Sequence, residues 1–244
     1  MANKVALDIT FRLPTHGRIR AGMKNDKGWP ISLKTFRLTS TDRGAVVQAA
    51  ETYGGEVKPW QNGKNQEWEV ITESSSMDVI LPPDCVSGPI WEYWNGKSMK
   101  FSCTGYDGVC DEHVPGPDGA EIVEKDCQCQ VHGKRVCKSK TRLSVLLPDV
   151  ALGGVWLLTT TSIHAAVELQ TMVNLVQMSY AQTLTPARLA LEPRVSTSGG
   201  KTKHFNVPVL RTQSTIMELQ ASAQAFGIPA GDNHIGAIEG ELIE

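Results

Sequence analysis

The 244-residue chain has little excess charge of either sign. Its 24 Lys and Arg residues face 26 Asp and Glu residues, which gives a formal net charge of −2 at pH 7. A chain so close to neutrality has no overall attraction for nucleic acid or for an anionic membrane surface. The composition therefore argues against a protein whose main ligand is the DNA backbone.

Long apolar runs are also missing. The most apolar stretch, residues 143–158, is interrupted by Pro148, Asp149 and a pair of glycines, so it cannot form a membrane-spanning helix. The first residues reach the acidic Asp8 before the apolar core of a signal peptide could develop. We therefore expect a soluble cytoplasmic protein with no membrane partner.

Sequence motifs of the common enzyme classes are missing as well. The chain contains neither G-x-S-x-G nor H-E-x-x-H. Residues 199–202 imitate the end of a phosphate-binding loop, but Val195 stands where that loop requires glycine. His164 follows a run of hydroxyl residues, which a helix N-terminus explains as well as a nucleophile–base pair does. We expect no catalytic residues and no enzyme.

Cysteine, in contrast, is concentrated in one 35-residue window that holds five of the six cysteines: Cys103, Cys110, Cys127, Cys129 and Cys137. Thiolates at such spacings can converge on one tetrahedral Zn²⁺. In a reducing cytoplasm, clustered thiols are more often metal ligands than disulfides, although an oxidised loop is the alternative. Four sulfur ligands close the coordination sphere, so the predicted Zn²⁺ is structural.

The ligand set is only partly determined by the spacing. Cys127, Cys129 and Cys137 form its core, and either Cys103 or Cys110 supplies the fourth sulfur. His113 and His132 are possible substitutes. The sixth cysteine, Cys85, lies outside the window and is expected to be a buried structural thiol.

Charged residues near the window and near the N-terminus are candidates for partner binding. Acids precede Cys127 and bases follow Cys129, which is typical either of two solvated faces or of a two-signed docking surface. The segment 17–22 places two arginines on one side of an extended chain, where they bind anions or form salt bridges to the domain itself. The candidate partner-binding residues are Arg18, Arg20, Lys134, Arg135 and Lys138.

Periodicity and turn residues divide the chain into five parts. Residues 1–32 read as an extended basic arm with little helix or strand, and residues 33–96 as a β-α-β-β unit. Residues 97–142 are the cysteine-rich zinc loop, residues 143–212 a second β-α-β-β unit, and residues 213–244 a C-terminal helix and mobile tail.

The second unit repeats the strand, helix, strand, strand order with which the first unit begins. The first contains strands at 34–39, 56–60, 67–72 and 77–81 with a helix at 42–53, and the second contains strands at 155–159, 187–194 and 204–210 with a helix at 164–182. A shift of about 120 residues overlays similar strand–helix junctions, by duplication or by chance. We therefore predict an α+β fold in which two duplicated units form one mixed-sheet body, with the zinc-binding loop inserted between them.

Three segments together resemble the recombination directionality factors that actinophages, including Streptomyces phages, use with large serine integrases. They are residues 17–22, residues 34–40, and residues 127–149 with the pattern CxC…C…TRL-x-V-x-LPD. Relatives, many labelled hydrolase or metal-binding protein, commonly show Cys-Asp-Gly before the CxC. Here Asp107-Gly108 follows Tyr106, which leaves the first zinc ligand open.

The resemblance implies a protein that does no strand chemistry. Such a factor binds integrase already on attachment-site DNA and switches it from integration to prophage excision, in the cytoplasm of the bacterial host. Near-neutral charge agrees with this role and with little direct DNA binding. The alternative is a zinc-containing protein that binds or processes single-stranded nucleic acid in phage DNA metabolism, because tryptophans on a sheet can stack bases.

Overall fold

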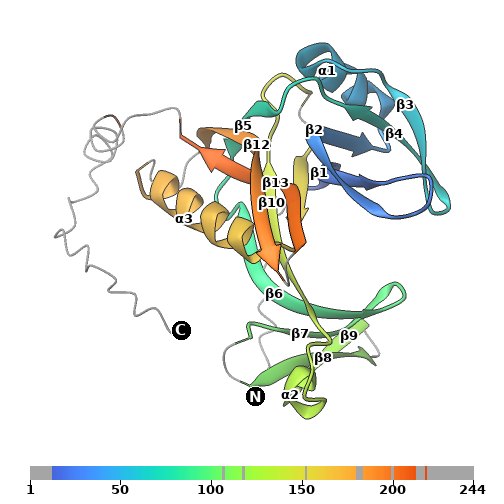
Figure 1. Cartoon of the computed structure of the whole chain (residues 1–244), viewed down its shortest axis with the longest axis vertical. Helices are drawn as coiled ribbons and strands as arrows, with labels where there is room; N and C mark the ends of the chain where they lie inside the picture. Colours follow the sequence, from blue (N-terminus) through green and yellow to red (C-terminus); the bar gives the residue numbers. More distant parts are fainter. Residues whose placement is uncertain are drawn as a thin grey trace, which may run out of the picture.

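The computed structural model describes residues 13–105, 108–116, 119–151, 153–179, 184–198, 201–212 and 218. These residues form an α+β fold with two β-sheets and few helices (Figure 1). The smaller sheet has the order β13 (Lys201–Arg211), β12 (Thr185–Ser198) and β5 (Ser76–Leu81). The larger sheet has the order β3 (Lys58–Asn62), β4 (Asn65–Ile71), β2 (Pro30–Ser40), β1 (Thr15–Lys24), β11 (Val155–Thr160), β10 (Lys138–Val145), β6 (Val86–Asn95), β7 (Ser98–Cys103), β8 (Val109–Gly116) and β9 (Gly119–Asp126).

Strand β1 lies inside the large sheet, so the expected arm with little strand content is wrong for residues 15–24. It pairs antiparallel with β2 and parallel with β11, in the register Arg20↔Arg37 and Arg18↔Leu157. Its alternation places Ile19 in the core and Arg18 in solvent. Gly17 fits against the Trp156 ring, where a Cβ atom would lie 2.5 Å from the nearest ring carbon. Pairing with the two neighbouring strands therefore holds this segment as a strand, although its glycines predict an irregular conformation.

Helix α1 (Arg43–Tyr53) matches the expected helix closely, because its ends are encoded locally. The Asp42 carboxylate accepts hydrogen bonds from the backbone N–H groups of Gly44 (2.8 Å) and Ala45 (3.4 Å). Gly54, at φ +75°, ends the helix and donates its N–H to the Ala50 carbonyl at 2.9 Å. The helix packs on β2 and β4.

Helix α3 (Ile163–Ser179) packs against β13, β6 and β10. Its buried side carries Ala165, Leu169 and Val173, whereas Val167 on another side is 58% exposed. The helix therefore covers the sheets (Figure 1) and is not the enclosed central helix that its apolar composition predicts.

One core joins the two sheets. It contains Phe36, Leu38 and Trp156 from the large sheet together with Val79 and Leu189 from the small sheet. Successive side chains of a strand point to opposite faces. The large sheet therefore turns its apolar face toward the small sheet. Its other face carries the side chains at the alternate strand positions, including Arg18, Arg20 and Arg37.

The expected single sheet of duplicated units is replaced by two sheets with different pairing. In the first unit β4 pairs directly with β2. In the second unit the β12–β13 hairpin pairs with β5, while β11 pairs with β1 and β10. The strands predicted for the two units are present in the predicted order, but the structure adds β1 and β6 to β10 and does not show the predicted duplication.

About half of the cysteine window is strand, so its expected loop character is wrong for β8 and β9. Strands β6 to β9 form consecutive antiparallel pairs and extend below the body in Figure 1, followed by the short helix α2 (Gln128–Val131) and by β10. No helix among the described residues is long and apolar enough to cross a membrane. The helix and tail predicted for 213–244 lie outside the described residues, except for residue 218.

Candidate functional site

Four of the clustered cysteines meet where strands β6 to β9 join β10. Cys103 ends β7, Cys127 is the N-cap residue of α2, Cys129 lies within α2, and Cys137 immediately precedes β10. The Cys103 thiol is close enough to Cys127 for Cys127 to raise its pKa, and Cys127 and Cys137 both act on the pKa of the Cys129 thiol. Strand pairing thus brings Cys103 to three thiols that follow it by more than twenty residues.

The backbone around Cys129 forms a tight turn that favours a thiolate. The N–H groups of Val136 and Cys137 donate to Cys129 Sγ at 3.4 and 3.5 Å. Gly133 adopts φ +58° in this turn, and Lys134 N–H donates to the Cys129 carbonyl at 3.1 Å. Burial by itself would raise the pKa of Cys129, but these backbone N–H groups and the neighbouring thiols lower it below its ordinary value.

Two other thiols of the cluster, those of Cys103 and Cys137, have raised pKa values. Burial, followed by the neighbouring Cys127, raises the pKa of Cys103 to about 11. Burial, followed by Cys129, raises the pKa of Cys137 to about 12. A bound cation would remove this penalty by stabilising several thiolates at once. Even so, no three His, Cys, Asp or Glu side chains in the described ranges already have the arrangement of a metal site.

Cys110 occupies a different position from the other four. It is buried, and its Sγ donates to the Asp126 carbonyl oxygen at 3.4 Å. Burial raises its pKa, and Cys127 adds to this effect. His113, a possible substitute ligand, is hydrogen-bonded through Nε2 to Ser102 Oγ at 2.8 Å. Cys85, outside the window, is buried as expected.

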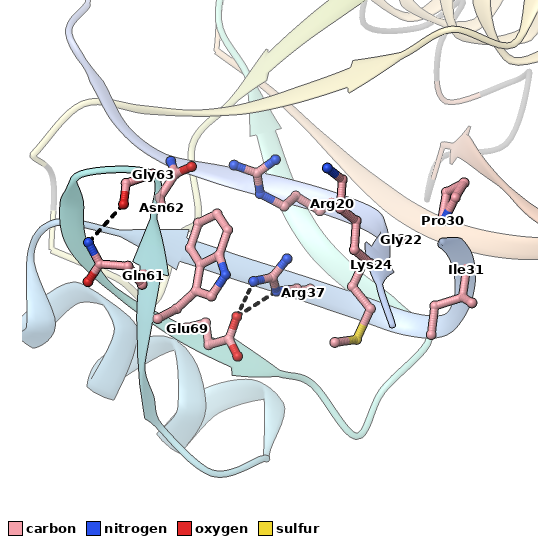
Figure 2. Close-up of a pocket in the computed structure, with 12 residues that line it drawn as sticks. Arg20, Gly22, Lys24, Pro30, Ile31, Arg37, Gln61, Asn62, Gly63 and Glu69 are labelled. Carbon is pink, nitrogen blue, oxygen red and sulfur yellow. Dashed lines mark hydrogen bonds and ion pairs between the residues drawn. The ribbon is translucent and has the colours of Figure 1, made fainter. Parts of the chain in front are cut away.

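A groove with a volume of about 690 Å³ lies on the solvent face of the large sheet, across β1, β2, β3 and β4. Figure 2 shows Arg20, Arg37 and Glu69 side by side within it. The Arg37 guanidinium carbon lies 4.2 Å from the centroid of the Trp60 ring, and that of Arg20 lies 5.2 Å from it. One indole therefore positions two guanidinium groups.

A second charged cluster lies where β6 meets β10. The Glu92 carboxylate accepts hydrogen bonds from Lys140 Nζ at 2.9 Å, from an Arg142 guanidinium nitrogen at 2.5 Å and from Trp94 Nε1 at 2.6 Å. Only 4% of Glu92 is exposed. Lys140 also lies 4.6 Å from the Trp94 ring centroid. These contacts hold the β6–β10 junction that supports the thiol cluster.

The predicted partner-binding residues fall into two groups. Arg18 and Arg20 share one face of β1. Lys134 and Arg135 lie in the exposed turn after α2, and Lys138 begins β10. Arg135 is stacked over Trp91, with 4.5 Å from its guanidinium carbon to the ring centroid.

Sequence reasoning missed Arg37, Trp60 and Glu69 as members of a site. The only signal that points to Arg37 is its place on the polar side of a strand whose other side is apolar. Read from the sequence, Trp60 is either a core residue or a base-stacking residue. The structure shows it instead as the support of two arginines.

Comparison with known proteins identifies the family. Residues 16–213 match a family model described as "Gp3-like: Recombination directionality factor-like". No curated protein and no solved structure matches the chain. The matched range includes both sheets, the thiol cluster and the groove, and it is well over half of the chain. This protein therefore belongs to the Gp3-like family of recombination directionality factor-like proteins.

Proposed function

We propose that this protein is a recombination directionality factor that binds a large serine integrase on attachment-site DNA. Its binding switches the integrase from integration to prophage excision, between the left and right attachment sites, in the bacterial host. The observation that carries the proposal is the family match over residues 16–213. The factor acts by binding, with no chemistry of its own and with little direct contact to DNA.

Such a switch is a shift between two arrangements of the integrase assembly. The factor must bind the excision-competent arrangement more tightly than the other, because equal affinity for both shifts nothing. Moving a preference from 1:99 to 99:1 requires about 5.5 kcal/mol of differential binding. Divided over four integrase subunits, this is about 1.4 kcal/mol for each, which corresponds to a tenfold affinity ratio. An interface of modest size supplies a difference of that order.

The test uses the purified full-length protein and its cognate integrase. We expect the two to bind without DNA, and we expect added protein to promote recombination between left and right sites while suppressing integration. Unchanged excision yields at saturating protein would contradict the proposal.

One observation favours the alternative of a single-strand-binding protein. Trp29 is 68% exposed, so its indole is accessible for base stacking. A fluorescence titration with single-stranded oligonucleotides separates the two functions. Micromolar binding with a steep dependence on salt would favour the alternative.

We further propose that Cys103, Cys127, Cys129 and Cys137 hold a structural Zn²⁺. Soft thiolates select Zn²⁺ over Mg²⁺ or Ca²⁺, and the mutual effects of these four thiols on one another's pKa values support the set. We leave Cys110 out of the proposed set because its thiol donates a hydrogen bond to the Asp126 carbonyl oxygen. Zinc would hold α2 against the end of β7 and the start of β10.

A matched pair of variants tests this ligand set. We expect Cys103→Ser to lose bound zinc and Cys110→Ser to retain one equivalent, as measured by elemental analysis of the purified proteins. Cys129→Ser should lose zinc and destabilise the α2 region while leaving the two-sheet core folded. Equal zinc content in wild type and Cys129→Ser would refute the ligand set.

A further inference from the structure

The groove on the solvent face contains one neutralised arginine and one that is not neutralised. Arg37 is almost fully buried and forms an ion pair with Glu69. Arg20 is partly buried, and its Nε donates to Thr39 Oγ1 at a long 3.4 Å. Within the described residues, neither Arg20 nor Arg18 forms an ion pair with a carboxylate.

The surroundings of Arg20 favour an added anion. Burial lowers the pKa of Arg20, and the neighbouring cations Arg37 and Arg18 lower it further. A partly desolvated cation beside two others gains stability when a carboxylate or phosphate binds to it. The Trp60 ring restrains the guanidinium, so little side-chain entropy remains to be lost on binding.

The remaining lining of the groove distinguishes between anions. Glu67 and Glu69 both act electrostatically on Arg20, so the charge around it is mixed, whereas a groove that follows a polyanionic phosphate backbone is lined by cations. Ile31, which lines the groove, is 42% exposed, and Trp29, in the turn between β1 and β2, is more exposed still. Arginine and tryptophan are enriched at the energetic centres of protein–protein interfaces.

We propose that this groove binds an acidic segment of the protein partner, with a carboxylate on Arg20 and an aliphatic side chain against Ile31. The inference rests on the proposed function, because the recombinase would supply this segment. A smaller pocket of about 290 Å³ adjoins the groove. Arg20 lines both cavities, and Arg18 lines the smaller one. Residues two apart on a strand lie roughly 6.6 Å apart on one face, so an extended acid-x-acid segment matches the two arginines.

The test measures the affinity of the full-length protein for its cognate integrase without DNA. Arg20→Gln removes the charge, and we expect it to raise Kd about 10- to 100-fold, because a desolvated interfacial charge loses its partner. Arg20→Lys keeps the charge without the two-pronged geometry and should show a smaller loss. Arg188→Gln is the matched control, because Arg188 is an exposed arginine paired with Asp78 on the small sheet, and its Kd should be unchanged.

The thermal unfolding of each variant is compared with that of wild type, to show that a variant with weaker binding is still folded. Should Arg20→Gln unfold, the exposed Arg18→Gln replaces it, with an expected loss of about 3- to 10-fold. Wild-type excision with unchanged affinity in the arginine variants overturns the groove proposal and leaves the proposed function standing. A loss confined to oligonucleotide binding identifies a phosphate ligand and also overturns it. If wild type neither binds nor switches integrase, the proposed function fails, and this inference fails with it.

Discussion

Replacing Glu92 with glutamine should destabilise the protein far more than neutralising an exposed acid does. The Glu92 carboxylate is almost fully buried and accepts hydrogen bonds from Lys140, Arg142 and Trp94. Glutamine keeps the shape and one oxygen acceptor but removes the charge that compensates the two cations. The substitution therefore isolates the electrostatic contribution of this junction between β6 and β10.

The magnitude follows from how far the two cations can regain water. Removing one partner of a fully buried ion pair costs roughly 3–5 kcal/mol. The side chains of Lys140 and Arg142 are 25% and 29% exposed, so part of this cost is recovered by hydration. We expect a loss of about 2–3 kcal/mol in the free energy of unfolding. For a chain of this size, that loss lowers Tm by about 4–12 °C.

The effect should depend on pH with a defined sign. Burial alone would raise the pKa of Glu92, but the hydrogen bonds from Lys140, Trp94 and Arg142 lower it below its ordinary value. The unfolded chain titrates near its ordinary pKa of about 4.3. The carboxylate thus contributes its stability above that pH, and the contribution is lost as the pH falls through the lower folded pKa.

Thermal unfolding followed by circular dichroism between pH 7 and pH 3 tests both parts of the argument. The control is Glu51→Gln, an exposed acid on α1, whose effect should stay within about 0.5 kcal/mol. A difference between wild type and Glu92→Gln that vanishes at pH 7, or that persists unchanged into acid, would refute this reasoning.

Three further predictions concern the core and its edges. Gly17→Ala should lower the stability by about 1–3 kcal/mol in chemical denaturation, because its Cβ would overlap the Trp156 ring; wild-type stability would show that β1 can shift. Asp42→Ala removes the helix N-cap and should cost about 1 kcal/mol in the same assay, and an unchanged midpoint would mean that the cap bonds contribute nothing. Burial raises the pKa of Cys85 to about 12, so iodoacetamide at pH 8 should leave it unmodified in the native protein by mass spectrometry; rapid native labelling would disprove its burial.

Elements with local signals could be predicted from the sequence. Helix α1 has an acidic N-cap at Asp42 and a glycine at its end, and both act through neighbouring backbone groups. The β12–β13 hairpin is predictable because alternating segments flank the sequence Ser-Gly-Gly, which favours a turn. In each case the residues that define the element lie within a few positions of it.

Elements defined by distant partners could not be predicted. Strand β1 contains Gly17 and Gly22, which indicate an irregular segment when read alone. Its pairing with β11 joins residues about 140 positions apart, and that of β5 with β12 joins residues about 110 apart. Nothing in the local composition reports which strand lies alongside, so the division into two sheets depends on packing alone.

The candidate sites show the same limit. The spacing of the cysteines indicates that thiols converge, but choosing Cys103 over Cys110 requires knowing where β7 ends beside α2. Likewise, Trp60 and Arg37 belong to β3 and β2, and β4 lies between those strands. Their contact follows from the sheet and has no signature in either segment.

The groove and the core are nevertheless consequences of one pattern in β1. Because side chains alternate along a strand, the register that buries Ile19 is the register that presents Arg18 and Arg20 on the opposite face. A one-residue slip would place both arginines in the apolar core and Ile19 in solvent, at a large cost in free energy. The packing of Gly17 on Trp156 opposes such a slip. Stability and the proposed binding surface are therefore linked through the same six residues, 17–22, and substitutions on the arginine side can alter binding without disturbing the fold.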